Sequence, residues 1–189
     1  MAPPAALTVL LLAAVTAIGD STCPDREALG GFDSSAFLGR WYVVKQTTIN
    51  SNASIECLSI LVKPAGELPG RLATHTRFVD RAHVATHVTL GVLFKEDNSS
   101  TNGKYLYSRR MSATESDKKY YILGTDYTNY AVTWYCFPSA VTGQVEEILT
   151  LLSRRPGLDP GLEARLPEGD YTAVAHDGCG GPGASPEGA

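Results

Sequence analysis

The chain has 189 residues, of which 43% are hydrophobic, and a formal net charge of −4. Proteins that bind nucleic acid normally present a strongly basic face, so this mild acidic balance argues against such a partner. Basic pairs do occur at Arg109-Arg110, Lys118-Lys119 and Arg154-Arg155. They are scattered, and the first two are interpreted as solvated strand ends.

The N-terminus carries an uncharged apolar run from Ala5 to Ile18, followed by small residues. The run is shorter than the roughly 20 residues of a transmembrane helix, and small residues suit cleavage by a signal peptidase. We predict that residues 1–19 are a secretory signal peptide, cleaved between 17 and 21, and that the mature protein is secreted and extracellular. Residues 20–179 then form one domain, and residues 180–189 form a disordered tail.

Four cysteines remain in the mature chain: Cys23, Cys57, Cys136 and Cys179. An even number behind a secretory signal indicates two disulfides, and the sequence alone leaves three pairings open. Two sequons predict N-glycosylation, at Asn52 and Asn98.

Short runs of β-branched and aromatic residues, separated by Gly, Pro, Asn and Asp, are typical of an all-β domain. Eight strands are predicted, at residues 40–47, 56–63, 71–79, 83–95, 104–111, 119–125, 129–136 and 145–154. In the run 83–95 the even positions are apolar and the odd positions include His83 and His87, so we expect the even side chains to face the interior. Eight half-buried strands either close into a barrel or stack as two sheets, and the alternation leaves both open.

A short helix is predicted after the eighth strand. Asp159-Pro160 is a typical N-cap followed by proline at the first helical position. The apolar residues Leu158, Leu162 and Leu166 recur at i, i+4 and i+8, which predicts a helix of roughly two turns. One more strand is expected at Tyr171 to Ala175.

Three ordered segments carry a family resemblance: Phe37-Leu38-Gly39-Arg40-Trp41-Tyr42, Thr125-Asp126-Tyr127 and Leu151-Leu152-Ser153-Arg154. Together they resemble the three conserved regions of the lipocalin family, in the kernel subgroup that includes apolipoprotein D and the insect bilin-binding proteins. The resemblance implies an all-β fold, an eight-stranded up-and-down antiparallel β-barrel with a short C-terminal α-helix (the lipocalin or calycin fold). It has one open mouth and one closed end.

The same resemblance implies structural roles at the closed end. The guanidinium of Arg154 would lie over the indole of Trp41, which follows Gly39, while Thr125, Asp126 and Tyr127 would shape a turn at that end. The implied disulfides are Cys23 with Cys136 and Cys57 with Cys179. If Cys57 and Cys136 face outward, their neighbours Leu58 and Tyr135 face inward.

The resemblance implies a secreted carrier that binds and transports a small hydrophobic ligand, such as a bilin, retinoid, fatty acid or steroid, rather than an enzyme. A barrel of eight strands has room for one small ligand. The expected ligand contacts are Val43, Lys45, Leu58, Ile60, Phe78, Val88, Leu90, Val92, Tyr121 and Tyr135. Lys45 would either pair with a ligand carboxylate or extend its ammonium to solvent.

Two other classes of function remain open. An extracellular interaction or inhibitor protein would use the loops at the barrel mouth. An enzyme of this family would need a lumenal thiol, but all four cysteines are assigned to disulfides. A haem site would need a lumenal histidine, whereas His75, His83 and His87 fall on the polar strand faces. His83 and His87 are about 13 Å apart in a strand, too far to share one ion, so no metal or other cofactor is predicted.

Overall fold

The structure is a computed structural model, and it describes residues 22–47, 55–66, 70–109, 118–139, 143–157 and 159–179. Nine strands and one helix are formed by these residues: β1 (Gly39–Thr47), β2 (Ile55–Pro64), β3 (Leu72–Asp80), β4 (Ala85–Lys95), β5 (Lys104–Ser108), β6 (Lys118–Thr125), β7 (Tyr130–Pro138), β8 (Val145–Ser153), α1 (Pro160–Glu163) and β9 (Tyr171–Ala173). The eight predicted strands are thus confirmed, and most of their ends lie within two residues of the prediction.

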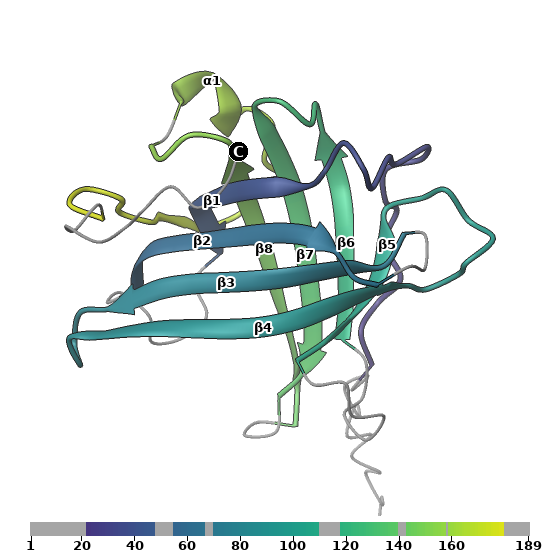
Figure 1. The fold of residues 1–189 in the computed structure, drawn as a ribbon, viewed down its shortest axis with the longest axis horizontal. Coiled ribbons are helices and arrows are strands. Elements are labelled where there is room, and N and C mark those ends of the chain that lie inside the picture. The colour runs from purple at the N-terminus through teal and green to yellow at the C-terminus, as the bar shows by residue number, and fades with distance from the viewer. Residues whose placement is uncertain are drawn as a thin grey trace, which may run out of the picture.

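The first eight strands form a closed antiparallel barrel. Each strand from β1 to β8 pairs with the next, and β1 also pairs with β8, so the sheet joins its own edge. In Figure 1 strands β2–β4 cross β6–β8, so the two halves of the wall face each other across the interior. The fold is therefore a barrel and not a sandwich of two sheets. Closure also removes the exposed sheet edges that would otherwise template aggregation.

One end of the barrel is sealed by aromatic side chains and by Arg154. Phe37 stacks on Trp41 with ring centroids 4.9 Å apart, and both side chains are fully buried. The guanidinium carbon of Arg154 lies 3.6 Å from the centroid of the Trp41 ring. Arg154 also donates hydrogen bonds to three backbone oxygens, those of Tyr127, Arg40 and Ala36. The side chain therefore ties the segment before β1, the start of β1 and the β6–β7 turn together. Of these contacts, the resemblance implied the position of Arg154 over Trp41.

Gly39 makes this arrangement possible. Its φ is +99°, a conformation that side chains disfavour, and an added Cβ would lie 3.1 Å from a guanidinium nitrogen of Arg154. The positive φ therefore favours glycine at this position, and a larger residue would also require the Arg154 guanidinium to shift by a few tenths of an ångström.

The β6–β7 turn at the closed end is organised by the side chain of Asp126. Its carboxylate accepts hydrogen bonds from the backbone amides of Thr128, Asn129 and Tyr130 and from the side-chain amide of Asn129. Desolvation acts to raise the pKa of Asp126, but the hydrogen bonds from Asn129 and from the turn amides outweigh it and hold the pKa below its usual 3.8.

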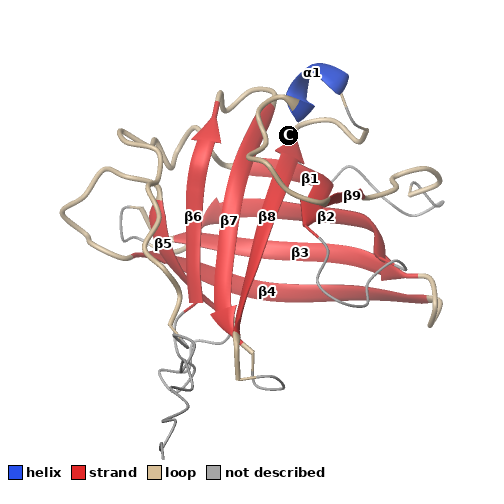
Figure 2. Cartoon of the chain, turned by 180° about the vertical axis from the view of Figure 1, so that it is seen from behind, coloured by secondary structure: helices blue, strands red, loops and turns tan. Residues whose placement is uncertain are grey.

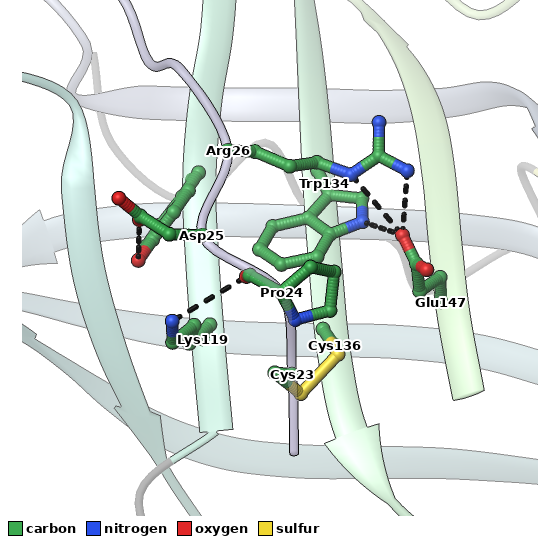
Figure 3. The surroundings of a disulfide bond; sticks show 9 residues. Cys23, Pro24, Asp25, Arg26, Lys119, Trp134, Cys136 and Glu147 are labelled. Atoms are coloured by element: carbon green, nitrogen blue, oxygen red, sulfur yellow. Dashed lines mark hydrogen bonds and ion pairs between the residues drawn. A yellow bond between two sulfur atoms is a disulfide. The ribbon is translucent and has the colours of Figure 1, made fainter. Parts of the chain in front are cut away.

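The N-terminal segment is fastened to the outside of β6–β8, as Figure 3 shows. Cys23 is bonded to Cys136 on β7. Arg26 and the indole nitrogen of Trp134 both donate to the carboxylate of Glu147 on β8. Trp134 is fully buried although it points away from the barrel interior, because this segment covers it.

The C-terminal part lies against the outer wall beside β1, β7 and β8 (Figure 2). Asp159 is the N-cap, and its side chain accepts a hydrogen bond from the amide of Gly161. The helix is shorter than predicted, because α-helical hydrogen bonding ends at Glu163 and the next turn is closed by shorter-range bonds. Leu162 and Leu166 still pack on the wall. Cys179 is bonded to Cys57 on β2, so both disulfides join the implied partners.

Several sequence predictions lie outside the described residues: the signal peptide, the tail at 180–189, Leu158 and the glycosylation site at Asn52. Asn98 is described, and it is exposed in the turn between β4 and β5. Within the described ranges no helix is long and apolar enough to cross a membrane.

We expect Arg154→Ala to lower the free energy of unfolding by about 3 kcal/mol, because it removes the cation–π contact and leaves three carbonyls without their charged donor. Urea unfolding at pH 7 measures the effect. Arg155→Ala is the matched control, since Arg155 is exposed beside it. Equal losses in the two variants would contradict the role given to Arg154.

We expect Asp126→Asn to destabilise the protein modestly at neutral pH, by less than about 1 kcal/mol because the carboxylate is exposed to solvent screening. The folded pKa lies below the unfolded value of 3.8. The ionised carboxylate therefore stabilises the fold above about pH 4, and this contribution is lost as pH falls through the folded pKa. Unfolding curves of both proteins should converge at acid pH. Asp170→Asn, which removes an exposed carboxylate outside the turn, should not reproduce that convergence.

Candidate functional site: the barrel interior

The barrel encloses a cavity of about 380 Å³, which opens at the end opposite Trp41. This volume lies within the range of small-molecule sites in proteins. All eight barrel strands contribute side chains to its wall: Val43, Gln46, Ile55, Leu58, Ile60, Thr74, Thr76, Phe78, Thr89, Leu93, Tyr107, Arg109, Lys118, Tyr120, Thr133, Tyr135, Phe137, Ile148 and Thr150. The described wall is mainly aliphatic and aromatic, with threonine and tyrosine hydroxyls set among these groups.

Half of the expected ligand contacts lie on this wall. The structure places five of the ten there: Val43, Leu58, Ile60, Phe78 and Tyr135. Leu58 and Tyr135 face inward because their neighbours Cys57 and Cys136 face outward to form the disulfides, as strand alternation predicts. That these residues touch a ligand stays a prediction. The other five residues do not line the cavity.

Lys45 lies outside the barrel because β1 contains a bulge. The register between β1 and β8 shifts between Val43 and Lys45, and such an extra residue reverses which positions face inward. Val43 faces the cavity, Val44 is buried beneath the C-terminal segment, and Gln46 faces the cavity again. The ammonium of Lys45 pairs with Glu163 of α1 at 2.9 Å. Its expected role inside the lumen is therefore wrong.

The apolar face of β4 points outward, contrary to the prediction. Val88 and Leu90 are 64% and 57% exposed, and Val92 shares their side of the strand. The β3–β4 register pairs Phe78 with His87 and Thr76 with Thr89, and directly paired side chains share a face. Since Phe78, Thr76 and Thr89 line the cavity, the odd positions of β4 face inward.

His87 is consequently on the lumenal face, at the mouth, where it stacks on Phe78 with ring centroids 4.9 Å apart. Its predicted position on an outward polar face is wrong. Among the described residues no three His, Cys, Asp or Glu side chains gather closely enough to hold a metal ion.

Tyr121 lies on the outside of β6, and its neighbour Tyr120 takes the inward position. Tyr121 pairs with Trp134 and Tyr120 pairs with Tyr135. Because Cys136 faces outward, its neighbour Tyr135 faces inward, and Tyr120, as the partner of Tyr135, faces inward as well. The β6–β7 register is therefore needed to identify Tyr120 as the lining residue. The hydroxyl of Tyr121 is 2.8 Å from the carboxylate of Glu96. Burial, together with that carboxylate, raises the pKa of Tyr121 above its usual value.

A group of aromatic side chains forms the wall between the middle of the cavity and its mouth. Tyr107 and Phe137 both pack against Tyr135, with centroid separations of 5.6 and 5.1 Å. Burial raises the pKa of Tyr120 to about 12, so its hydroxyl remains a hydrogen-bond donor at neutral pH.

Gly91 on β4 provides the space for Tyr107. A Cβ added at Gly91 would lie 2.3 Å from the Tyr107 ring, so the ring rests directly on the backbone there. The glycine stands within a strand, which is a known signal for close approach of another group.

Two cations that were interpreted as solvated strand ends lie at the mouth. Arg109 directly follows β5, and Lys118 is the first residue of β6. Lys118 pairs with Tyr107 across the two strands, and both cations line the cavity. Strand alternation could have predicted that both cations face inward, because each lies two residues from an inward-facing tyrosine, Tyr107 or Tyr120.

Comparisons with known proteins agree with this architecture. A model of the lipocalin / cytosolic fatty-acid binding protein family matches residues 38–165. The Lazarillo protein of Schistocerca americana is 25% identical over 150 residues, which are 79% of this chain and 68% of that protein. Insecticyanin-A of Manduca sexta is 25% identical over 115 residues, 60% of this chain and 59% of its own length. The chain thus spans only part of these relatives.

The solved structure of insecticyanin from Manduca sexta has the same fold. It superposes with a TM-score of 0.60 at 21% identity, covering 76% of this chain and 75% of that one. The family match extends from the start of β1 to the residues after α1, and therefore includes every strand of the barrel. This chain belongs to the lipocalin / cytosolic fatty-acid binding protein family.

Proposed function

We propose that this protein is a secreted carrier that holds one small hydrophobic molecule, such as a bilin, retinoid, fatty acid or steroid, inside its barrel. The observation that carries the proposal is the cavity of about 380 Å³, walled mainly by aliphatic and aromatic side chains and closed at one end by the contact of Arg154 with Trp41. Moving an apolar molecule from water into such a wall is favourable by about 25 cal/mol for each Å² of apolar surface buried.

The polar groups of the wall support orientation of the ligand rather than its chemical conversion. Tyr107, Tyr120 and Tyr135 place hydroxyl groups on the wall, and such groups fix a bound molecule by hydrogen bonds. Catalysis by a lumenal thiol would need a free cysteine. All four cysteines of the chain are joined in the two disulfides, which favours a carrier.

Export from the cell is supported by the same disulfides, because such bonds persist in oxidising compartments. The N-terminal apolar run and the exposed position of Asn98 in a turn agree with passage through the secretory pathway. The alternative of an interaction or inhibitor protein would use loops at the barrel mouth. Residues 48–54, 110–117 and 140–142 lie outside the described residues.

We expect the purified protein to bind at least one of retinol, biliverdin, a long-chain fatty acid or a steroid with one-to-one stoichiometry and a dissociation constant of about 1 μM or below. Quenching of protein fluorescence measures the titration, and native mass spectrometry identifies what co-purifies. The proposal is wrong if none of these ligands saturates the protein and nothing co-purifies.

We expect Gly91→Ala to weaken binding of the same ligand at least about tenfold, because the new methyl group drives the Tyr107 ring into the cavity. The matched control is the double variant Gly91→Ala with Tyr107→Ala, which removes the displaced ring and should recover most of the affinity. Circular dichroism confirms that both variants remain folded. Unchanged affinity in folded Gly91→Ala would contradict the placement of the ligand beside Tyr107.

A further inference from the structure

The described wall of the cavity has an uneven distribution of charge. Its side chains include two permanent cations, Arg109 and Lys118, and no aspartate or glutamate. We call these two residues the mouth pair. The rest of this lining is uncharged at neutral pH. At the rim, Glu146 pairs with Phe137 in the β7–β8 register and therefore shares its face. A ligand thus meets two cations and one carboxylate at the mouth and a neutral surface below them.

The mouth pair occupies one side of the opening. Arg109 leaves the end of β5 and Lys118 begins β6, and these strands are direct neighbours in the sheet. The ammonium of Lys118 lies 5.5 Å from the centroid of the Phe137 ring on the next strand, β7. The cation is thus held against an apolar rim, where water screens it less than on an open surface.

Other cations near the barrel interior are engaged elsewhere. Lys45 pairs with Glu163 on the outer wall. Lys95 lies at the closed end, with its ammonium 4.6 Å from the centroid of the Tyr105 ring, and donates a hydrogen bond to the backbone oxygen of Asn102. Of the five ion pairs formed among the described residues, none uses the mouth pair.

The space below the mouth pair suits the apolar part of a ligand. Going inward from the mouth, Tyr107 on β5 and Tyr120 on β6 are the next cavity-facing residues of these strands. Each lies two residues from a member of the mouth pair. Deeper in, Val43 and Leu93 are almost completely buried and border the aromatic closed end. From the mouth inward, the wall therefore changes from cationic to hydroxyl-bearing aromatic to mainly aliphatic, with threonine hydroxyls among the aliphatic groups.

We propose that the carried molecule is an anionic amphiphile whose acidic group is held at the mouth by Arg109 and Lys118, with its apolar body directed toward Trp41. This inference rests on the proposed carrier function and narrows its ligand to acids. An arginine presents two parallel donors to one carboxylate, and hydrogen bonds between charged partners are about twice as strong as neutral ones. Neutral alcohols and esters of the same shape forgo that interaction.

The test compares cis-parinaric acid with its methyl ester, two fluorescent ligands with the same apolar chain. We expect the natural chain to bind the acid about tenfold more tightly than the ester, as one charge-assisted contact at a partly screened rim predicts. In the double variant Arg109→Gln with Lys118→Gln, the affinity for the acid should fall to that for the ester. Affinity for the ester should change less than about twofold.

The matched control is Lys63→Gln with Arg155→Gln, which removes two exposed cations at the closed end of the barrel. It lowers the net charge equally and should keep the tenfold preference for the acid. A preference lost in this control as well would show general electrostatic attraction and overturn the proposal. The proposal also fails if the natural chain binds acid and ester equally, although the carrier function would then stand. Only failure of both probes and of the neutral ligands named above would count against the carrier function itself.

Discussion

The contact between Arg154 and Trp41 is the constraint on which the rest of the barrel depends. The guanidinium lies 3.6 Å from the indole centroid and also binds three backbone carbonyls from separate segments. A barrel end built from turns leaves carbonyl groups that need donors, and a single planar cation with five N–H groups can satisfy several at once. Because this end is sealed, the cavity does not open beside Trp41.

Bulges then decide which side chains form the cavity wall. The register shifts within β1, β2 and β6, and each shift changes which alternate residues point inward. In β1, ordinary alternation buries Val43 toward the cavity and Val44 beneath the C-terminal segment. The bulge that follows Val43 then keeps Lys45 on the outer side with Val44 and returns Gln46 to the cavity. The same shift moves Lys45 outward and leaves the described lining without a cation below the mouth.

The two disulfides and the N-terminal segment stabilise the wall from outside. Cys23–Cys136 holds a segment that covers Trp134 and Tyr121, and Cys57–Cys179 holds the chain that follows β9 against β2. Long crosslinked loops reduce the entropy of the unfolded chain. A rigid wall matters for a container, because a preformed cavity avoids the cost of ordering side chains when a ligand enters.

The sequence by itself determined the positions of the strands, the N-cap at Asp159 and, through the family resemblance, the barrel, its closed end and the disulfide partners. These features are local, or are marked by motifs that survive at low identity. The tertiary structure alone decided which side of each strand faces the cavity. Alternation along β4 places Val88 and Leu90 on one face and His87 on the other, but it does not say which face points inward. That is decided by the pairing of His87 with the cavity-lining Phe78. For the same reason Tyr120 rather than Tyr121 lines the cavity, and Arg109 and Lys118, which resemble solvated strand ends in the sequence, meet at its mouth.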